Sequence, residues 1–300
     1  MVARMRASST PSIEEWESRG RRLVLDGPSL ASQEVFVVDV PPEHGDGEPL
    51  VVVHGFPTSS YDWAHLVDAM AAQRRVVLVD LPGYGLSDKP DTAYRIASSA
   101  DAVMSVVAQL GIEQLALLSH DMGDTVVGEL LARNIDGVWP VRVTRRVVTN
   151  GSIYIAMAQL TDGQLLLLDL PDEIAPQGPG AELLAASLVA TLAAGHRDID
   201  MTEHARIVCH RDGDRLLPRL IRYIEERRSN EARFTGAIEA HPAPLAVLWG
   251  PEDPIAVAAM AERLVGARPD AELRWIDGAG HYPQVEEPDA YLTALLDVLE

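Results

Sequence analysis

The segment "LLSHDMGD", residues 117–124, decides the fold. Its apolar beginning predicts a buried strand, and the residues after Asp121 begin a helix, so a sharp turn has to lie at Asp121. A strand–turn–helix bend of this kind usually presents a serine nucleophile flanked by small residues. Here Asp121 stands in the nucleophile position, with Ser119 and Gly123 as the small residues. The alternative interpretation is that Asp121 only caps the helix, a common role for aspartate.

Strand-like runs alternate with helical segments along most of the chain. Strands separated by helices imply right-handed crossovers and a mostly parallel sheet, and β-branched residues around a turn predict that the first two strands form an antiparallel pair. We expect strands at 21–26, 33–40, 49–56, 74–81, 113–120, 144–151, 244–250 and 271–278, and helices at roughly 60–72, 94–110, 122–133, 256–266 and 287–299.

The alternation stops between about residues 152 and 234. Apolar residues in this interval recur at helical spacing, as in "ELLAASLVATLAAG" and "LLPRLIRYIEERR". This pattern predicts a helical cap inserted into an α/β core. We therefore expect a core domain of residues 1–151 and 235–300 and a cap of residues 152–234.

The composition limits the classes of function. The formal net charge of −20 disfavours nucleic acids and anionic membrane surfaces, because both require clustered Lys and Arg. No apolar run is long enough to cross a bilayer, and the first 20 residues lack the apolar region of a secretory signal. The single cysteine, Cys209, fits a reducing cytoplasm. We expect a cytoplasmic monomer or homodimer that acts on a small molecule.

Two further residues follow strands in an informative order. Asp253 lies in "LWGPEDPIA", three residues beyond Gly250, and His281 lies in "GAGHYPQVEEP" before the last helix. Separately, Asp253 would be explained as a helix cap and His281 as a structural histidine. The order nucleophile, acid, base is that of the α/β-hydrolase triad, and ligands bind at the carboxyl edge of such sheets. Together the residues predict a triad of Asp121, Asp253 and His281.

The segment "HGFPTSSYDW", residues 54–63, follows another expected strand. The backbone N–H groups of Phe56 and of Met122, the residue after the nucleophile, are the expected donors of an oxyanion hole. The Phe56–Pro57 peptide is a candidate for the cis form, which occurs mainly before proline.

Five motifs carry a family resemblance: "HGFPTSSYDW", "DLPGYGLSDKP", "LLSHDMGD", "GPEDP" and "GHYPQVEEP". The chain resembles the epoxide hydrolase and haloalkane dehalogenase branch of the α/β-hydrolases, and is closely similar to the mesoderm-specific transcript proteins of that branch. The similarity runs from about residue 15 to the end of the chain and is weakest in the cap. The resemblance implies an α/β-hydrolase fold with a mostly parallel eight-stranded sheet, flanking helices and an inserted helical cap.

An aspartate nucleophile suits an alkylating electrophile. Asp121 would attack an sp³ carbon and form an ester, and His281, oriented by Asp253, would activate the water that hydrolyses it. In the resembled family, haloalkane dehalogenases cradle the halide with a Trp after the nucleophile plus a Trp or Asn. Fluoroacetate dehalogenases place an Arg after the nucleophile. Met122 and Phe56 supply no such donor, so the resemblance favours epoxide opening.

Epoxide hydrolases of the family protonate the ring oxygen with cap tyrosines. Tyr223, in "RLIRYIEERRSNEARF", stands where the second cap tyrosine is expected, although it could simply pack between helices. Tyr154 is a weaker candidate, expected as wall rather than acid, and no first-half partner stands in the cap. Epoxide hydrolases usually carry Trp where this chain has Met122.

The expected reaction is the opening of a small apolar epoxide to a vicinal diol. The alternatives are a haloalkane dehalogenase-like hydrolase and a non-catalytic homologue that binds a small molecule or signals. No cofactor is expected, and no cluster of His, Cys, Asp and Glu has metal-ligand spacing.

Overall fold

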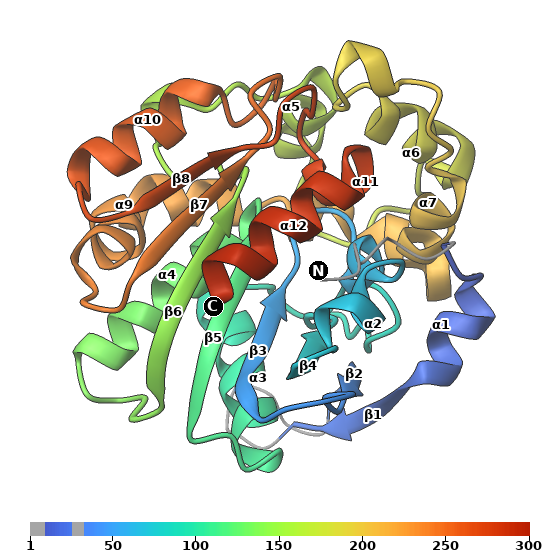
Figure 1. Ribbon diagram of the computed structural model, residues 1–300. Helices are drawn as coiled ribbons and strands as arrows, with labels where there is room; N and C mark the ends of the chain where they lie inside the picture. Colours follow the sequence, from blue (N-terminus) through green and yellow to red (C-terminus); the bar gives the residue numbers. More distant parts are fainter. Residues whose placement is uncertain (1–9, 26–32) are drawn as a thin grey trace.

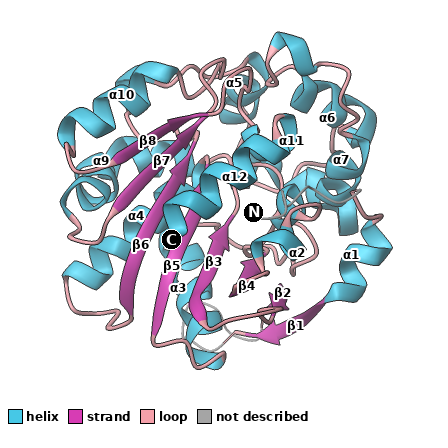
Figure 2. Cartoon of the chain, viewed as in Figure 1, coloured by secondary structure: helices cyan, strands magenta, loops and turns pink. Residues whose placement is uncertain are grey.

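Eight strands form one sheet in the computed structural model, which describes residues 10–25 and 33–300 (Figures 1 and 2). The strand order is β1-β2-β4-β3-β5-β6-β7-β8. β2 pairs antiparallel with β1 and β4, and the other neighbours are parallel. The mostly parallel eight-stranded sheet is thus confirmed. The strands are β1 (Gly20–Val24), β2 (Glu34–Val40), β3 (Gly47–Val53), β4 (Arg74–Val79), β5 (Gln114–His120), β6 (Arg142–Thr149), β7 (Leu245–Trp249) and β8 (Glu272–Trp275).

Helices cover both faces of this sheet, because the central strands are apolar on both sides. Val51 and Val53 of β3 face one apolar layer, and Leu50 and Val52 face the other. The helices outside the β6–β7 connection are α1 (Ile13–Arg19), η1 (Ser60–Trp63), α2 (Val67–Met70), α3 (Ile96–Gln109), α4 (Met122–Ile135), α10 (Ala258–Ala267), α11 (Pro283–Glu286) and α12 (Pro288–Leu299), where η denotes a 3₁₀ helix.

Two sequence expectations differ from the structure at the start of the chain. The helix expected at 60–72 is broken into η1 and α2, and the Ser59 side chain caps η1 by accepting from the Tyr61 N–H. Helix α1 was not expected, and its capping box is formed by Ser12 and Glu15. The final residue of the strand expected at 21–26 lies outside the described residues.

The connection between β6 and β7 is helical, as expected. Helices α5, α6 and α7 lie beyond the carboxyl ends of the parallel strands (Figure 1). In order, the connection contains η2 (Ile155–Met157), α5 (Asp162–Asp169), α6 (Gly180–Val189), η3 (Ala194–His196), α7 (Thr202–Cys209), η4 (His210–Leu216), α8 (Leu217–Leu220) and α9 (Tyr223–Ala240). None of the helices in the described ranges is long and apolar enough to span a membrane.

Helix α9 crosses the boundary expected between cap and core at residue 234. The helix is kinked at Asn230, where the backbone is non-helical. Its second half packs closely on α4, because a Cβ atom at Gly128 would lie 2.6 Å from the carbonyl oxygen of Phe234. The division at residues 152 and 234 therefore stays a prediction, and in the structure the return to the core begins within one helix.

Arg146 of β6 fixes the return from α9 to β7. Its side chain is buried, and it donates to the carbonyl oxygens of Ile238 (2.6 Å) and Ala243 (2.6 and 3.1 Å). These carbonyls belong to the end of α9 and to the loop before β7, where water cannot replace the guanidinium easily. Arg146 thus satisfies buried acceptors at the point where the chain re-enters the sheet.

Replacing this arginine should weaken the fold. We expect Arg146→Met to lower the free energy of unfolding by about 3 kcal/mol, because buried carbonyls lose their donors. The matched control is Arg145→Met on the same strand, whose ion pair with Glu272 spans 3.8 Å and is partly exposed, so its cost should stay below about 1 kcal/mol. Urea unfolding measures both, and equal losses would contradict the role given to Arg146.

Candidate active site

Asp121 lies at a strained turn between β5 and α4. Its φ of 50° and ψ of −115° belong to a region that non-glycine residues rarely occupy. Two glycines allow the turn to pack closely. A Cβ atom at Gly55 would lie 2.6 Å from that of Asp121, and one at Gly123 would lie 2.3 Å from the carbonyl oxygen of Val53. The turn therefore holds Asp121 directly against the loop after β3.

The Asp121 side chain does not cap α4. It makes no capping hydrogen bond with that helix, and its Oδ2 accepts from the Phe56 N–H at 2.9 Å. Met122 opens α4, so its N–H has no acceptor within the helix. The structure thus disfavours the capping interpretation. The Phe56 N–H donates to the Asp121 carboxylate, while the expected role of Met122 as the second donor stays a prediction.

The loop that carries Phe56 is held by His54. The Nδ1–H of this buried ring donates to the Gly55 carbonyl oxygen at 2.9 Å, and its Nε2 accepts from the Leu81 N–H at 3.0 Å. Burial lowers the pKa of His54, which favours the neutral ring that these two bonds require. The Phe56–Pro57 peptide is cis, as expected.

Asp253 and His281 are brought together across 28 residues of sequence. His281 Nδ1 lies 2.8 Å from Asp253 Oδ2. The other carboxylate oxygen accepts from the N–H groups of Ile255 (2.7 Å) and Ala256 (3.0 Å). Asp253 therefore caps the following turn and also orients the His281 ring.

The charges around His281 keep its ring protonated at neutral pH. Burial alone would lower the pKa of His281, but the carboxylates of Asp253, Asp121 and Glu286 raise it to about 9. Loss of one of these negative charges would lower the pKa of His281.

Asn150 is a site residue that the sequence analysis missed. It follows β6 with a positive φ of 44°, and its Nδ2 donates to Asp253 Oδ2 at 2.8 Å. Its Oδ1 accepts from the Gly250 N–H at 2.9 Å. The "TNG" sequence signals a turn, but the partners of Asn150 lie about 100 residues away in the chain.

Glu286 is the second missed residue. Its buried carboxylate accepts from the N–H groups of Gly280 (2.8 Å) and Tyr282 (2.8 Å), which flank His281, and from the Ala193 N–H (2.7 Å). Ala193 lies in the β6–β7 connection, so Glu286 links the His281 loop to that connection. The backbone N–H of His281 donates to the carbonyl oxygen of Thr191, in the same connection, at 3.3 Å.

The two tyrosines proposed from sequence lie in different places. Tyr223 is buried, and its ring centroid is 5.6 Å from that of Phe56. Burial and the charge of Asp121 raise its pKa, and the guanidinium of Arg227 lies 5.0 Å above its ring. Tyr154 instead donates to Glu239 at 2.7 Å and lies beneath Arg263. The Tyr154 hydroxyl hydrogen is thus bound by Glu239, so Tyr154 is not positioned to act as an acid.

Tyr84 is a further tyrosine near the nucleophile. Its hydroxyl donates to Met122 Sδ at 3.2 Å, and its ring packs on His54 with centroids 5.1 Å apart. Burial raises the pKa of Tyr84, and the charge of Asp121 adds to this effect. The sequence analysis included Tyr84 only within the motif "DLPGYGLSDKP" and did not single it out as a site residue.

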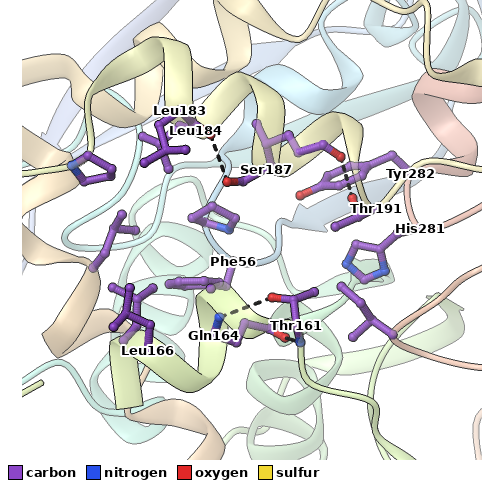
Figure 3. A pocket seen from close by; sticks show the side chains of 17 residues that line it. Phe56, Thr161, Gln164, Leu166, Leu183, Leu184, Ser187, Thr191, His281 and Tyr282 are labelled. Carbon is purple, nitrogen blue, oxygen red and sulfur yellow. Dashed lines mark hydrogen bonds between the residues drawn. The ribbon is translucent and has the colours of Figure 1, made fainter. Parts of the chain in front are cut away.

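A cavity of about 310 Å³ lies beside His281. Its lining includes Phe56 and His281 and otherwise comes largely from α5 and α6 (Figure 3). The described residues that line this cavity do not include Asp121 or Tyr223. Phe56 lines the cavity and contacts both of them, Asp121 through its backbone N–H and Tyr223 through its ring.

Other chemistry is poorly supported. Burial raises the pKa of the Cys209 thiol to about 11, so it is not poised as a thiolate nucleophile. Within residues 10–25 and 33–300, no group of three or more His, Cys, Asp or Glu residues is arranged to hold a metal ion.

Comparison with known proteins agrees with the fold. A family profile described as "alpha/beta hydrolase fold" matches residues 48–288. A putative hydrolase LipZ of Mycobacterium tuberculosis is 35% identical, covering 97% of this chain and 99% of that protein. The mesoderm-specific transcript protein of Mus musculus is 28% identical, covering 96% and 88%. The resemblance to the mesoderm-specific transcript proteins is thereby confirmed.

A solved structure gives the same architecture. A probable hydrolytic enzyme from Pseudomonas aeruginosa superposes with a TM-score of 0.76 at 18% identity, covering 98% of this chain and 95% of that one. At this level of identity the likeness shows the fold alone.

Removing the charge of Glu286 should loosen the His281 loop. In Glu286→Gln the amide nitrogen cannot accept, so at least one of the three N–H donors loses its partner, at a cost of about 1–3 kcal/mol in unfolding free energy. The pKa of His281 should fall because a negative charge is removed. Histidine titration by nuclear magnetic resonance and urea unfolding measure the two effects.

The control is Glu287→Gln, the neighbouring and partly exposed glutamate. It should change neither quantity by much. A pKa of His281 that stays near 9 in Glu286→Gln would show that Glu286 does not set the electrostatics of the ring.

Proposed function

We propose that this chain opens an epoxide to a vicinal diol. The premise is that the chain belongs to the α/β-hydrolase fold family and is a hydrolase of that fold. One observation carries the proposal. A carboxylate, Asp121, occupies the nucleophile turn and is held on the Phe56 N–H, with a His–Asp pair beside it. A carboxylate is suited to attack sp³ carbon, as in an epoxide.

The hydrogen bond from Phe56 selects the attacking oxygen. Oδ2 of Asp121 accepts this bond, which leaves Oδ1 as the oxygen that forms a bond to the epoxide carbon. The carbon–oxygen bond of the ring breaks, and the ring oxygen takes its electrons. The product of this step is an alkyl ester of Asp121 and an alkoxide that requires a proton.

Tyr223 is the proposed donor of that proton. It packs against Phe56 and is close enough to Asp121 for the carboxylate to raise its pKa. Its elevated pKa keeps the hydroxyl protonated until an alkoxide develops, which is a stronger base. The guanidinium of Arg227 over the ring would stabilise the phenolate that remains.

Alkylation would also convert His281 into a base. While Asp121 is ionised, its charge helps to hold the pKa of His281 at about 9. The ester is neutral, so this contribution disappears and the pKa of His281 falls. The protonated ring then loses its proton to solvent. The neutral ring takes a proton from water, which attacks Cγ of Asp121, and the Phe56 N–H stabilises the oxyanion on Oδ2. The Cγ–Oδ1 bond breaks, the imidazolium gives its proton to the leaving oxygen, and the diol is released. The Tyr223 phenolate regains a proton from solvent.

Two alternatives remain. A haloalkane dehalogenase-like reaction has weaker support, because the Met122 and Phe56 side chains carry no N–H for a halide. A non-catalytic binding role is favoured by one observation, that the cavity lining includes Phe56 and His281 but not Asp121. For the epoxide reaction, the substrate has to reach Asp121 beyond the residues that line the cavity. We further propose a small apolar substrate and a cytoplasmic monomer or homodimer.

The two-step scheme predicts different defects in two variants. His281→Gln should still form the ester but hydrolyse it slowly, so that intact mass spectrometry detects an adduct with a small epoxide. Asp121→Asn should form none. In a single turnover of the unmodified chain in heavy-oxygen water, Asp121 should acquire the label and the diol should not. Label found directly in the first-turnover diol would overturn the scheme.

The Tyr223 hydroxyl should matter in the first step only. General-acid assistance contributes about 10²–10⁴-fold, so Tyr223→Phe should slow ester formation within this range while ester hydrolysis changes little. Tyr154→Phe is the control, because its hydroxyl bonds to Glu239. Pre-steady-state alkylation of Asp121 measures both variants. Unchanged alkylation in Tyr223→Phe would assign that residue to packing.

A further inference from the structure

The cavity has two chemically different ends (Figure 3). His281 and Tyr282 lie at one end, beside the proposed reaction centre, and Leu166, Leu183 and Leu184 lie at the other. The first end has groups that can hydrogen-bond to a ligand. The leucine end can bind one only by removing apolar surface from water.

Hydrogen-bonding groups along the cavity wall are partly used by the protein itself. The hydroxyl of Ser187 donates to the Leu183 carbonyl oxygen at 2.8 Å, and that of Thr191 donates to the Leu188 carbonyl oxygen at 2.7 Å (Figure 3). The side-chain oxygen of Gln164 accepts from the Thr161 N–H at 2.9 Å. A ligand acceptor in the middle of the cavity would therefore lose water without gaining either hydroxyl as a donor.

The leucine end opens to solvent between α5 and α6. Leu166 and Leu183 line the cavity, yet they are 64% and 59% exposed. A ligand longer than the cavity would therefore emerge at these two residues. Residues 159–196, which include both helices, contain no Lys or Arg and five acidic residues. Arg222 reaches the end of α5, but its guanidinium is bound by the carbonyl oxygens of Leu167, Leu168 and Leu170. A carboxylate at the far end of a ligand would thus meet acidic neighbours and no cation from this segment.

We propose that the substrate class is a neutral aliphatic chain with its electrophilic carbon near one end. The reactive end lies at His281, and the tail extends along the leucine wall to the opening at Leu166 and Leu183. The nature of the reactive end rests on the proposed function. The tail site rests on the cavity alone, so the two can be tested separately.

The tail site is tested first with ligands that do not react. Straight 1-alkanols from butanol to dodecanol are titrated into the unmodified chain by calorimetry. Affinity should rise by up to about fourfold per methylene and level off once the chain reaches the opening. Omega-hydroxy carboxylic acids of the same length should bind about tenfold more weakly or worse. Affinity that does not depend on length, or equal binding of the acids, would overturn the proposal.

Adjacent leucines of α5 supply a matched pair of variants. Leu165 and Leu166 are both exposed, but only Leu166 is among the cavity-lining residues. Leu166→Asp should weaken decanol binding about tenfold and leave butanol binding unchanged, whereas Leu165→Asp should affect neither. Circular dichroism checks the fold, and Leu183→Asp on α6 repeats the test from the opposite side. Equal effects of the two α5 variants would contradict the proposed path.

Turnover of straight-chain 1,2-epoxides then separates the two proposals. If the alkanols show the length dependence and no epoxide alkylates Asp121, the epoxide reaction is wrong and the tail site stands. If epoxides are hydrolysed at rates independent of chain length, the reaction stands and the tail site is wrong.

Discussion

The hydrogen bond from the Phe56 N–H to Asp121 Oδ2 joins the two turns on which the site depends. It can form only because Asp121 adopts a positive φ and Gly55 leaves room beside it. β3 and β5 are neighbours in the sheet, so both turns leave the same edge and need little further alignment. The bond also makes the two carboxylate oxygens inequivalent. One is held by a backbone donor, and the other is left to react in the proposed scheme.

The histidine loop is positioned by a different principle. Its backbone N–H groups converge on one buried carboxylate, Glu286, which also accepts from Ala193 in the β6–β7 connection. This connection is therefore hydrogen-bonded to the His281 loop through the Glu286 side chain and through the Thr191 carbonyl oxygen, which accepts from the His281 backbone N–H. A displacement of Thr191 and Ala193 would be transmitted to the His281 loop through these two hydrogen bonds.

Much of this arrangement could be predicted from the sequence. Apolar runs located the strands, and the order of Asp121, Asp253 and His281 after three of them predicted where their side chains would meet, because parallel strands share a carboxyl edge. Periodicity could not give contacts between distant segments. Glu286 looked like one acid in an acidic chain, and Asn150 like a turn residue. Both acquire their roles from partners that only the folded chain brings near.

The position of a residue in the sequence also does not determine where its side chain points. Tyr154 follows β6 closely, yet its hydroxyl is bound by Glu239 of α9. Tyr84 lies in a turn of the core, yet it contacts Met122 beside the nucleophile. Side-chain direction here follows from which charged and apolar neighbours surround each ring, and these neighbours come from other elements.

The overall charge of the protein and the charge of its site have to be considered separately. A net charge of −20 belongs mainly to exposed side chains, whose effect is screened by salt within about 10 Å. The charges of Asp121, Asp253 and Glu286 are buried, so they act on His281 with little screening. Three carboxylates around one imidazole strongly favour its protonated form. Neutralising one of them is therefore the most direct way to release a base, and in the proposed reaction the substrate itself does so by forming an ester with Asp121.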